Sequence, residues 1–243
     1  MFMAAASLLP GSIARLAVGN SIAAKQDRAE NARQVAELVC LRPESAERLA
    51  TMDFRRVAEE SGIEPWKLHG MADIEARRGG FAANGRSISV PELHKFSQFT
   101  FRAYDKTHPD LSIEKWIHPS KVKPGHPYRL DNEGRWDILA RQAALDFDAA
   151  IRAASWGAFQ IMGFNYRKLG FDAPMELVRY VYRGERAQLE LAVRYLIVDG
   201  GFEPLLKNDY VSAAVVQNGP GKPKEYAAEW REASEKRRKE FYA

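Results

Sequence analysis

Glu75 is a carboxyl group placed where it could act as an acid. It shares one face of a predicted helix with Leu68, Met71 and Ala72, because the three apolar residues lie at i, i+3 and i+4 and Glu75 lies at i+7. A carboxyl on that face loses hydration, which raises its pKa and lets it protonate the leaving oxygen of a glycosidic bond. Spacing alone favours a plainer interpretation, in which Glu75 pairs with a basic neighbour such as Arg77 at the helix end.

Glu92 is a second candidate carboxyl group. It follows a short alternating segment in which Ile88 and Val90 predict a strand, and His94 lies beside it. A turn or hairpin there could bring Glu92 across a cleft from Glu75, where it would activate water or stabilise the charge that develops on the sugar ring. The alternative, a solvated charge in a turn, fits the spacing equally well.

Residues 155–165, SWGAFQIMGFN, combine glycines, aromatics, an amide and a methionine. The glycines permit close approach of a ligand or another backbone, and Gln160 offers a donor and an acceptor to a sugar. Trp156 and Phe159 could be sugar platforms, although core packing is the usual role of aromatic residues. Further on, Asn218 in the turn QNGPG could bind substrate or cap the turn.

The elements that must position these groups are mainly helices. Pro65 and the Gly79-Gly80 pair predict the start and end of the helix that carries Glu75. Residues 105–135 hold four prolines and predict a long irregular loop. Further helices are expected at residues 26–40, 43–52, 54–61, 136–154, 156–169, 174–182, 185–198, 210–216 and 223–241. The fold class predicted is mainly α-helical α+β with one small β element.

The 243 residues fit one catalytic domain over 51–243 with an N-terminal helical extension of unknown role over 1–50. The first 25 residues look like a weak signal or membrane-release segment. Pro10 and Arg15 interrupt the apolar run and no basic n-region precedes it, so a buried or partner-binding helix, or a frayed end, is favoured over membrane contact. We expect synthesis in the cytoplasm without a clear cleavable signal peptide.

Composition narrows the partners. The formal net charge of +4 favours an anionic partner, which could be nucleic acid, an acidic membrane or the bacterial wall. The basic run at 236–240 is typical of a solvated helix end, so nucleic acid is not expected. The single cysteine, Cys40, excludes an intramolecular disulfide.

Other chemistries have little support. The five histidines show no metal-ligand spacing and there are no paired cysteines, so we expect neither a metal site nor a cofactor. The chain contains no GxSxG, P-loop or GxGxxG motif.

The ordered segments ADIEARRGGF, GRSISVPELHKF, THPDLS, AASWGAFQIMGFN and QNGPG together resemble the bacteriophage N-acetylmuramidase family typical of endolysins. The resemblance covers about residues 53–230, and SWGAFQIMGFN is its most specific element. It implies a lysozyme-like fold and hydrolysis of the β-1,4 bond between N-acetylmuramic acid and N-acetylglucosamine in the peptidoglycan of the bacterial wall. We expect an enzyme that acts as a monomer in the periplasm or outside the cell.

The resemblance implies roles for single residues. The family's catalytic glutamate falls on Glu75, its F-E-x-H motif on Glu92 and His94, and the glutamine of its W-G-x-F-Q-I-M-G motif on Gln160. With Glu75 and Glu92 as catalytic residues, the substrate-binding candidates are His94, Trp156, Phe159, Gln160, Met162, Asn165 and Asn218. Three positions depart from the family pattern: Ala76, Pro91 and Gln217.

Two alternatives remain open. Lytic transglycosylases share the order Glu, then G-x-x-Q, then N-x-G, and they close an anhydro ring instead of admitting water. A wall-binding or virion structural module without activity would also keep the fold, and Ala76 and Gln217 are compatible with it. For hydrolysis, carboxyls about 5 Å apart would predict retention of configuration, and roughly 6.5 to 9.5 Å would predict inversion.

Overall fold

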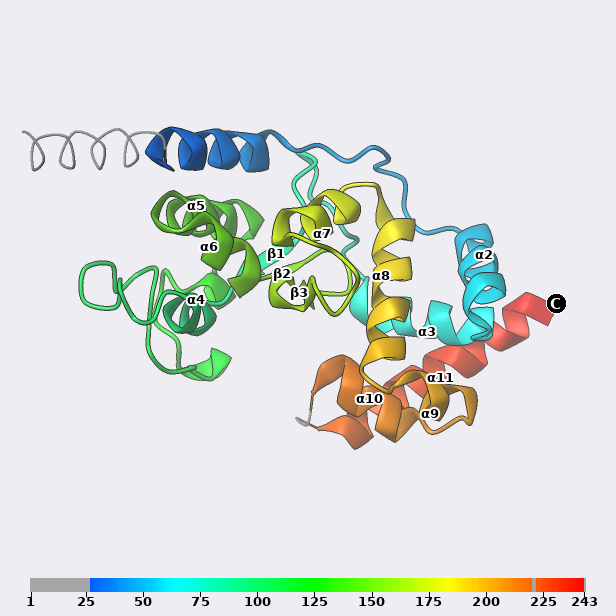
Figure 1. Cartoon of the computed structure of the whole chain (residues 1–243). Coiled ribbons are helices and arrows are strands. Elements are labelled where there is room, and N and C mark those ends of the chain that lie inside the picture. Colours follow the sequence, from blue (N-terminus) through cyan, green and yellow to red (C-terminus); the bar gives the residue numbers. More distant parts are fainter. Residues whose placement is uncertain (1–26, 220–221, 243) are drawn as a thin grey trace, which may run out of the picture. The chain divides into compact units, whose positions relative to one another are not determined.

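The computed structural model describes residues 27–219 and 222–242, and its chain divides into two compact units (Figure 1). The first unit, Met1–Cys40, contains a helix over residues 27–40, as its spacing predicts. The second unit, Leu41–Ala243, holds the other elements. The predictions made for residues 1–26 lie outside the described residues.

The second unit is mainly helical, which confirms the predicted α+β fold class. Its elements are α2 (Thr51–Ser61), α3 (Pro65–Glu75), β1 (Ser89–Pro91), α4 (Leu93–Phe99), η1 (Pro119–Lys121), η2 (Pro127–Arg129), α5 (Asn132–Leu145), α6 (Phe147–Ala153), β2 (Ala154–Trp156), β3 (Ile161–Met162), η3 (Gly163–Asn165), α7 (Pro174–Val181), α8 (Glu185–Val198), α9 (Phe202–Leu206), α10 (Tyr210–Asn218) and α11 (Pro223–Tyr242).

Helix α3 lies against the C-terminal helix α11 (Figure 1). It begins at Pro65 as predicted, because the fixed φ of proline suits the first helical position, but it ends at Glu75, before the glycine pair that was predicted to end it. Gly70 makes the close approach possible, because a Cβ there would lie 2.6 Å from the Ser234 backbone nitrogen. The Trp230 indole N–H on α11 donates to the Lys67 carbonyl at 2.9 Å. The two helices therefore form one packed pair.

The small sheet is antiparallel with the order β1-β2-β3. Val90 pairs with Ser155, and Ser155 pairs with Met162 on its other side. The predicted strand at Ile88 and Val90 is therefore confirmed as β1. Because β1 ends one residue before Glu92, the sheet fixes where that carboxyl group begins its helix.

Two predicted helices are absent, and the single helix predicted over residues 136–154 is divided into α5 and α6 at Asp146, whose backbone is extended. Residues 43–50 run without helix, since the Leu49 N–H donates to the buried Glu185 carboxylate at 3.1 Å and so satisfies its hydrogen bond across the fold. Residues 156–169 form β3, η3 and turns after the end of β2, because Trp156 pairs with Ser89 in the sheet. Gly157 and Gln160 also have φ angles of 75° and 51°, which a right-handed helix excludes.

Candidate active site

Glu75 is the last residue of α3 and its side chain is half-buried. Its Oε1 accepts a hydrogen bond from the Tyr226 hydroxyl on α11. Burial raises the pKa of the Glu75 carboxyl, while the Tyr226 hydrogen bond and the charge of Arg77 oppose the rise. Within the described residues, its Oε2 accepts no hydrogen bond, so one oxygen is held and the other stays available.

The turn after Glu75 is fixed by buried polar groups of α8. A Cβ at Gly80 would lie 2.0 Å from the Gln188 amide oxygen, and a Cβ at Gly79 would lie 2.7 Å from the Glu185 carboxylate. The Gly80 N–H donates to Glu185 at 2.8 Å. The Gly-Gly pair is therefore needed for the backbone to reach α8, and it lies beyond the end of the helix at Glu75.

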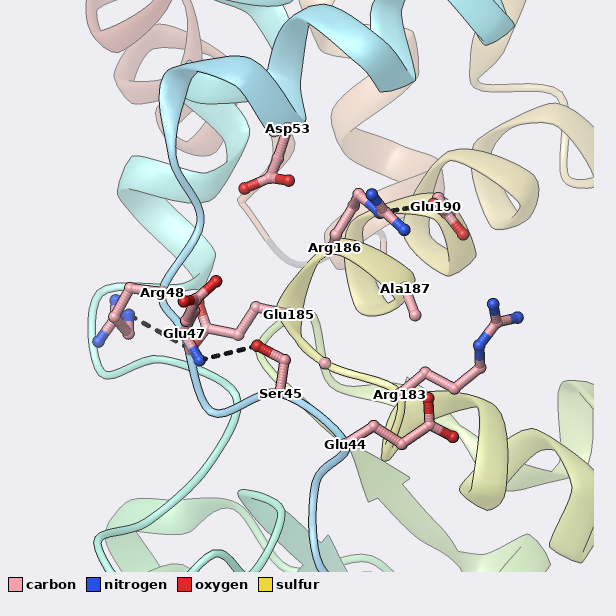
Figure 2. Close-up of a pocket in the computed structure, with 11 residues that line it drawn as sticks. Glu44, Ser45, Glu47, Arg48, Asp53, Arg183, Glu185, Arg186, Ala187 and Glu190 are labelled. Carbon is pink, nitrogen blue, oxygen red and sulfur yellow. Dashed lines mark hydrogen bonds and ion pairs between the residues drawn. The ribbon is translucent and has the colours of Figure 1, made fainter.

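Arg48 joins this turn from the extended segment before α2. Its guanidinium donates to the Ala76 carbonyl at 3.0 Å and pairs with Glu185 at 3.2 Å. Figure 2 shows Arg48, Glu185 and Ser45 on one side of a charged pocket, with Arg186 and Glu190 paired across it. The carbonyl directly after Glu75 thus belongs to a charged network that restrains the backbone there.

Glu92 is the N-cap residue of α4, directly after β1. The Tyr128 hydroxyl donates to its Oε2, and the His94 Nδ1 lies 3.5 Å from the same oxygen. Burial raises the pKa of Glu92, while the Tyr128 hydrogen bond and the charge of Lys95 oppose the rise. Glu92 and Glu75 share no hydrogen-bond partner among the described residues.

Gln160 braces the sheet in this structure. Its amide oxygen accepts from the Ser155 hydroxyl at 2.8 Å, and its amide nitrogen donates to the carbonyls of Gly157 at 2.7 Å and Ile88 at 3.3 Å. These bonds use the donor and acceptor that the sequence offered to a sugar. They hold the turn after β2 against the chain that leads into β1.

Of the remaining residues that were predicted to bind substrate, three are buried and three are not. Trp156 is 1% exposed, Phe159 3% and Asn165 7%. Their burial favours the core-packing interpretation and removes the two rings as sugar platforms. Met162 is half-buried on β3, His94 is half-buried on α4 beside Glu92, and Asn218 is exposed at the end of α10.

The described residues contain no group of three His, Cys, Asp or Glu side chains arranged to hold a metal ion. No helix in the described part of the chain is both long and apolar enough to cross a membrane.

The sequence profile of the family described as N-acetylmuramidase matches residues 64–238, which include both carboxyl sites and the whole sheet. The chain belongs to the N-acetylmuramidase family. This muramidase is therefore an enzyme that hydrolyses peptidoglycan and acts on the bacterial cell wall, as the resemblance predicts. No curated protein matches the chain.

The fold of the muramidase is similar to that in the crystal structure of Burkholderia AP3 phage endolysin. The TM-score is 0.68 at 24% sequence identity, over 79% of this chain and 71% of that chain. This likeness confirms the predicted lysozyme-like α+β fold.

Sequence reasoning missed the residues that hold the two carboxyls. Tyr226 is 151 positions from Glu75, and Tyr128 lies in the irregular loop. A partial signal exists for Tyr226, because Tyr226 and Trp230 are four residues apart and so share one helical face. That spacing indicates packing and does not identify the partner.

Proposed function

We propose that this muramidase hydrolyses the β-1,4 bond between N-acetylmuramic acid and N-acetylglucosamine, with Glu75 as the general acid. The observation that carries the proposal is the state of Glu75: half-buried, with a raised pKa and one oxygen held by Tyr226. Burial favours the protonated form of the carboxyl, and because Tyr226 holds Oε1, we assign the proton to Oε2. Oε2 then delivers it to the leaving sugar oxygen.

Glu92 is proposed as the second carboxyl group of the reaction. Burial raises the pKa of Glu92, while the hydrogen bond from Tyr128 and the charge of Lys95 oppose the rise; the role of orienting water or stabilising an oxocarbenium ion requires the ionised form of this carboxyl. His94, 3.5 Å from Glu92, supports the same oxygen. In this proposal, α3 supplies the acid, Glu75. The start of α4 supplies Glu92, which acts as a base toward water or stabilises the oxocarbenium ion.

We propose fewer residues as direct substrate contacts than the sequence led us to expect. His94, Met162 and Asn218 remain as direct contacts, because none of the three side chains is fully buried. Gln160 acts through the sheet that it braces and so positions the chain around β1. We take the muramidase to act as a monomer, with residues 51–243 as its catalytic domain and residues 1–50 as an extension.

The test is mass spectrometry of fragments released from purified peptidoglycan by the wild type, Glu75→Gln and Glu92→Gln. Glu60→Gln, at an exposed glutamate on α2, is the matched control. We expect reducing N-acetylmuramic acid ends from the wild type and the control, and a loss of about 100-fold to 10,000-fold with Glu75→Gln, the range for a general acid.

Other products would assign other functions. Anhydro ends would identify a lytic transglycosylase. An unchanged rate in Glu75→Gln would remove Glu75 from the chemistry. No release by the folded wild type would favour a wall-binding or structural module.

A further inference from the structure

An apolar pocket of about 370 Å³ lies where the irregular loop over residues 105–135 meets the start of α4. Its apolar lining comes from Leu93, Ile113, Ile117 and Pro124. Lys121 and Lys123 also line it, and both are exposed. Neither lysine forms an ion pair with a described residue, and Asp110 in the lining is already engaged by Arg141. The pocket therefore combines apolar walls with two free cations.

The loop that forms this pocket is anchored to the helices. Leu111 packs with Leu93 and Ile138 in a small core, against which Ile113 lies. The Gln142 amide on α5 donates to the Leu111 carbonyl at 2.7 Å. These contacts fix the loop before any ligand arrives, so the pocket is preformed.

Trp116 presents an exposed ring beside this pocket. The residue is 54% exposed although it is aromatic, and it directly precedes Ile117 of the lining. Its indole N–H donates to the Tyr128 hydroxyl at 3.2 Å, and its ring meets His118 edge-on at 5.7 Å. The ring is thus held in one orientation while much of it remains open to a ligand.

The surface is continuous with Glu92. The Tyr128 hydroxyl that accepts from Trp116 donates to the Glu92 carboxylate. His126, which lines the pocket, packs against Tyr128 with the two rings tilted and their centroids 4.6 Å apart, and Leu93 of the lining follows Glu92 directly. A glycan that reaches Glu92 therefore brings its substituents to Trp116 and the pocket.

We propose that Trp116 and the pocket bind a muramoyl unit together with its peptide stem, which rests on the proposed function. A bare glycan is rich in hydroxyls and does not suit the apolar walls, and it offers the lysines only the lactyl carboxylate of each muramoyl unit. The stem supplies alanine methyl groups for the pocket and carboxylates for Lys121 and Lys123. The indole offers an apolar face to the C–H groups of the sugar and an edge already satisfied by Tyr128.

Binding of Glu75→Gln to purified peptidoglycan, with stems intact or removed by an amidase, tests the proposal without cleavage. We expect preference for the stem-bearing form. In that background, Lys121→Ala with Lys123→Ala should weaken binding to stem-bearing peptidoglycan by about threefold to tenfold and weaken binding to the stripped form less, because each stripped muramoyl unit keeps only its lactyl carboxylate. Trp116→Ala should weaken binding to both forms.

The controls are Lys236→Ala with Lys239→Ala, the same charge change on α11, and Tyr242→Ala, an exposed aromatic residue on α11. Thermal unfolding of each variant shows whether a loss of binding is due to a loss of folding. If Trp116→Ala does not fold, binding by the variant of the exposed residues Lys121 and Lys123 decides the test. Equal binding to both forms, or equal losses in the two lysine pairs, would overturn the proposal. Fragment release by the wild type, measured in parallel, decides the proposed function separately.

Discussion

At the scale of single residues, both candidate carboxyls show the same arrangement. Burial raises the pKa of each, and a tyrosine hydroxyl donates to each and opposes the rise. Burial raises the pKa of Tyr226 and of Tyr128, and the neighbouring carboxylates raise both further, so both phenols stay protonated and act as donors. Because burial and the tyrosine hydrogen bond oppose each other, the pKa of each carboxyl rises less than burial alone would raise it.

Tyr226→Phe tests this tuning at Glu75. The variant removes an effect that lowers the pKa of Glu75, so that pKa rises further. Because the protonated form is the active one, the alkaline limb of the pH profile of kcat/KM should move to higher pH. Tyr242→Phe, a matched change at an exposed tyrosine on α11, should leave the limb in place. A lower rate with an unmoved limb would show that Tyr226 only supports the packing.

At the scale of elements, the pair formed by α3 and α11 places Glu75 and Tyr226 together. Arg237 on α11 makes a two-pronged pair with Asp73 on α3, with distances of 2.6 and 2.7 Å. Such paired hydrogen bonds to a charged group fix orientation as well as adding stability. The geometry of the candidate acid therefore depends on how closely these two helices approach.

Gly70→Ala tests that dependence. Alanine gains about 1 kcal/mol of helix propensity over glycine, but its Cβ would lie 2.6 Å from backbone at Ser234. Overpacking of this kind costs about 1 to 3 kcal/mol, and we expect net destabilisation because backbone cannot move aside as a side chain can. Activity should fall as α11 shifts Tyr226.

The control is Gly134→Ala in the first turn of α5. Its added Cβ meets the Leu130 side chain at 3.2 Å, which can give way. Chemical denaturation and the rate of fragment release measure both effects. An unchanged free energy of unfolding in Gly70→Ala would mean that the helix pair tolerates separation.

At the scale of the whole molecule, the family match and both candidate carboxyls lie inside one compact unit, Leu41–Ala243. That unit contains its own buried core, from Phe54 on α2 to Trp230 on α11. The net charge of +4 favours association with an anionic wall, and salt should weaken that association.

Deletion of residues 1–40 tests what the first unit contributes. We expect the shortened chain to fold and to release the same fragments from purified peptidoglycan, because no residue of the candidate site is removed. The full-length and shortened chains are then compared on intact cells. If the shortened chain loses lysis of cells but still releases fragments from purified peptidoglycan, residues 1–40 have a targeting role. An insoluble product would assign these residues to folding instead.

The sequence by itself determined the elements whose signals are local. Apolar spacing after Pro65 predicted α3 and put Glu75 on its apolar face, although the helix ends before the glycine pair, and alternation at Ile88 and Val90 predicted a strand where β1 lies. Both signals depend on contacts within a few residues, as do the bounds of α7 and α8. The ordered motifs were also enough to indicate the muramidase family.

Only the tertiary structure decided which groups surround those residues. The helix expected over 43–52 is absent before residue 51 because Glu185, far along the chain, takes the N–H of Leu49. Trp156 and Phe159 are core residues because the sheet and helices close over them. Tyr226 reaches Glu75 across 151 positions. Such contacts depend on how elements pack in space, and local spacing does not encode that packing.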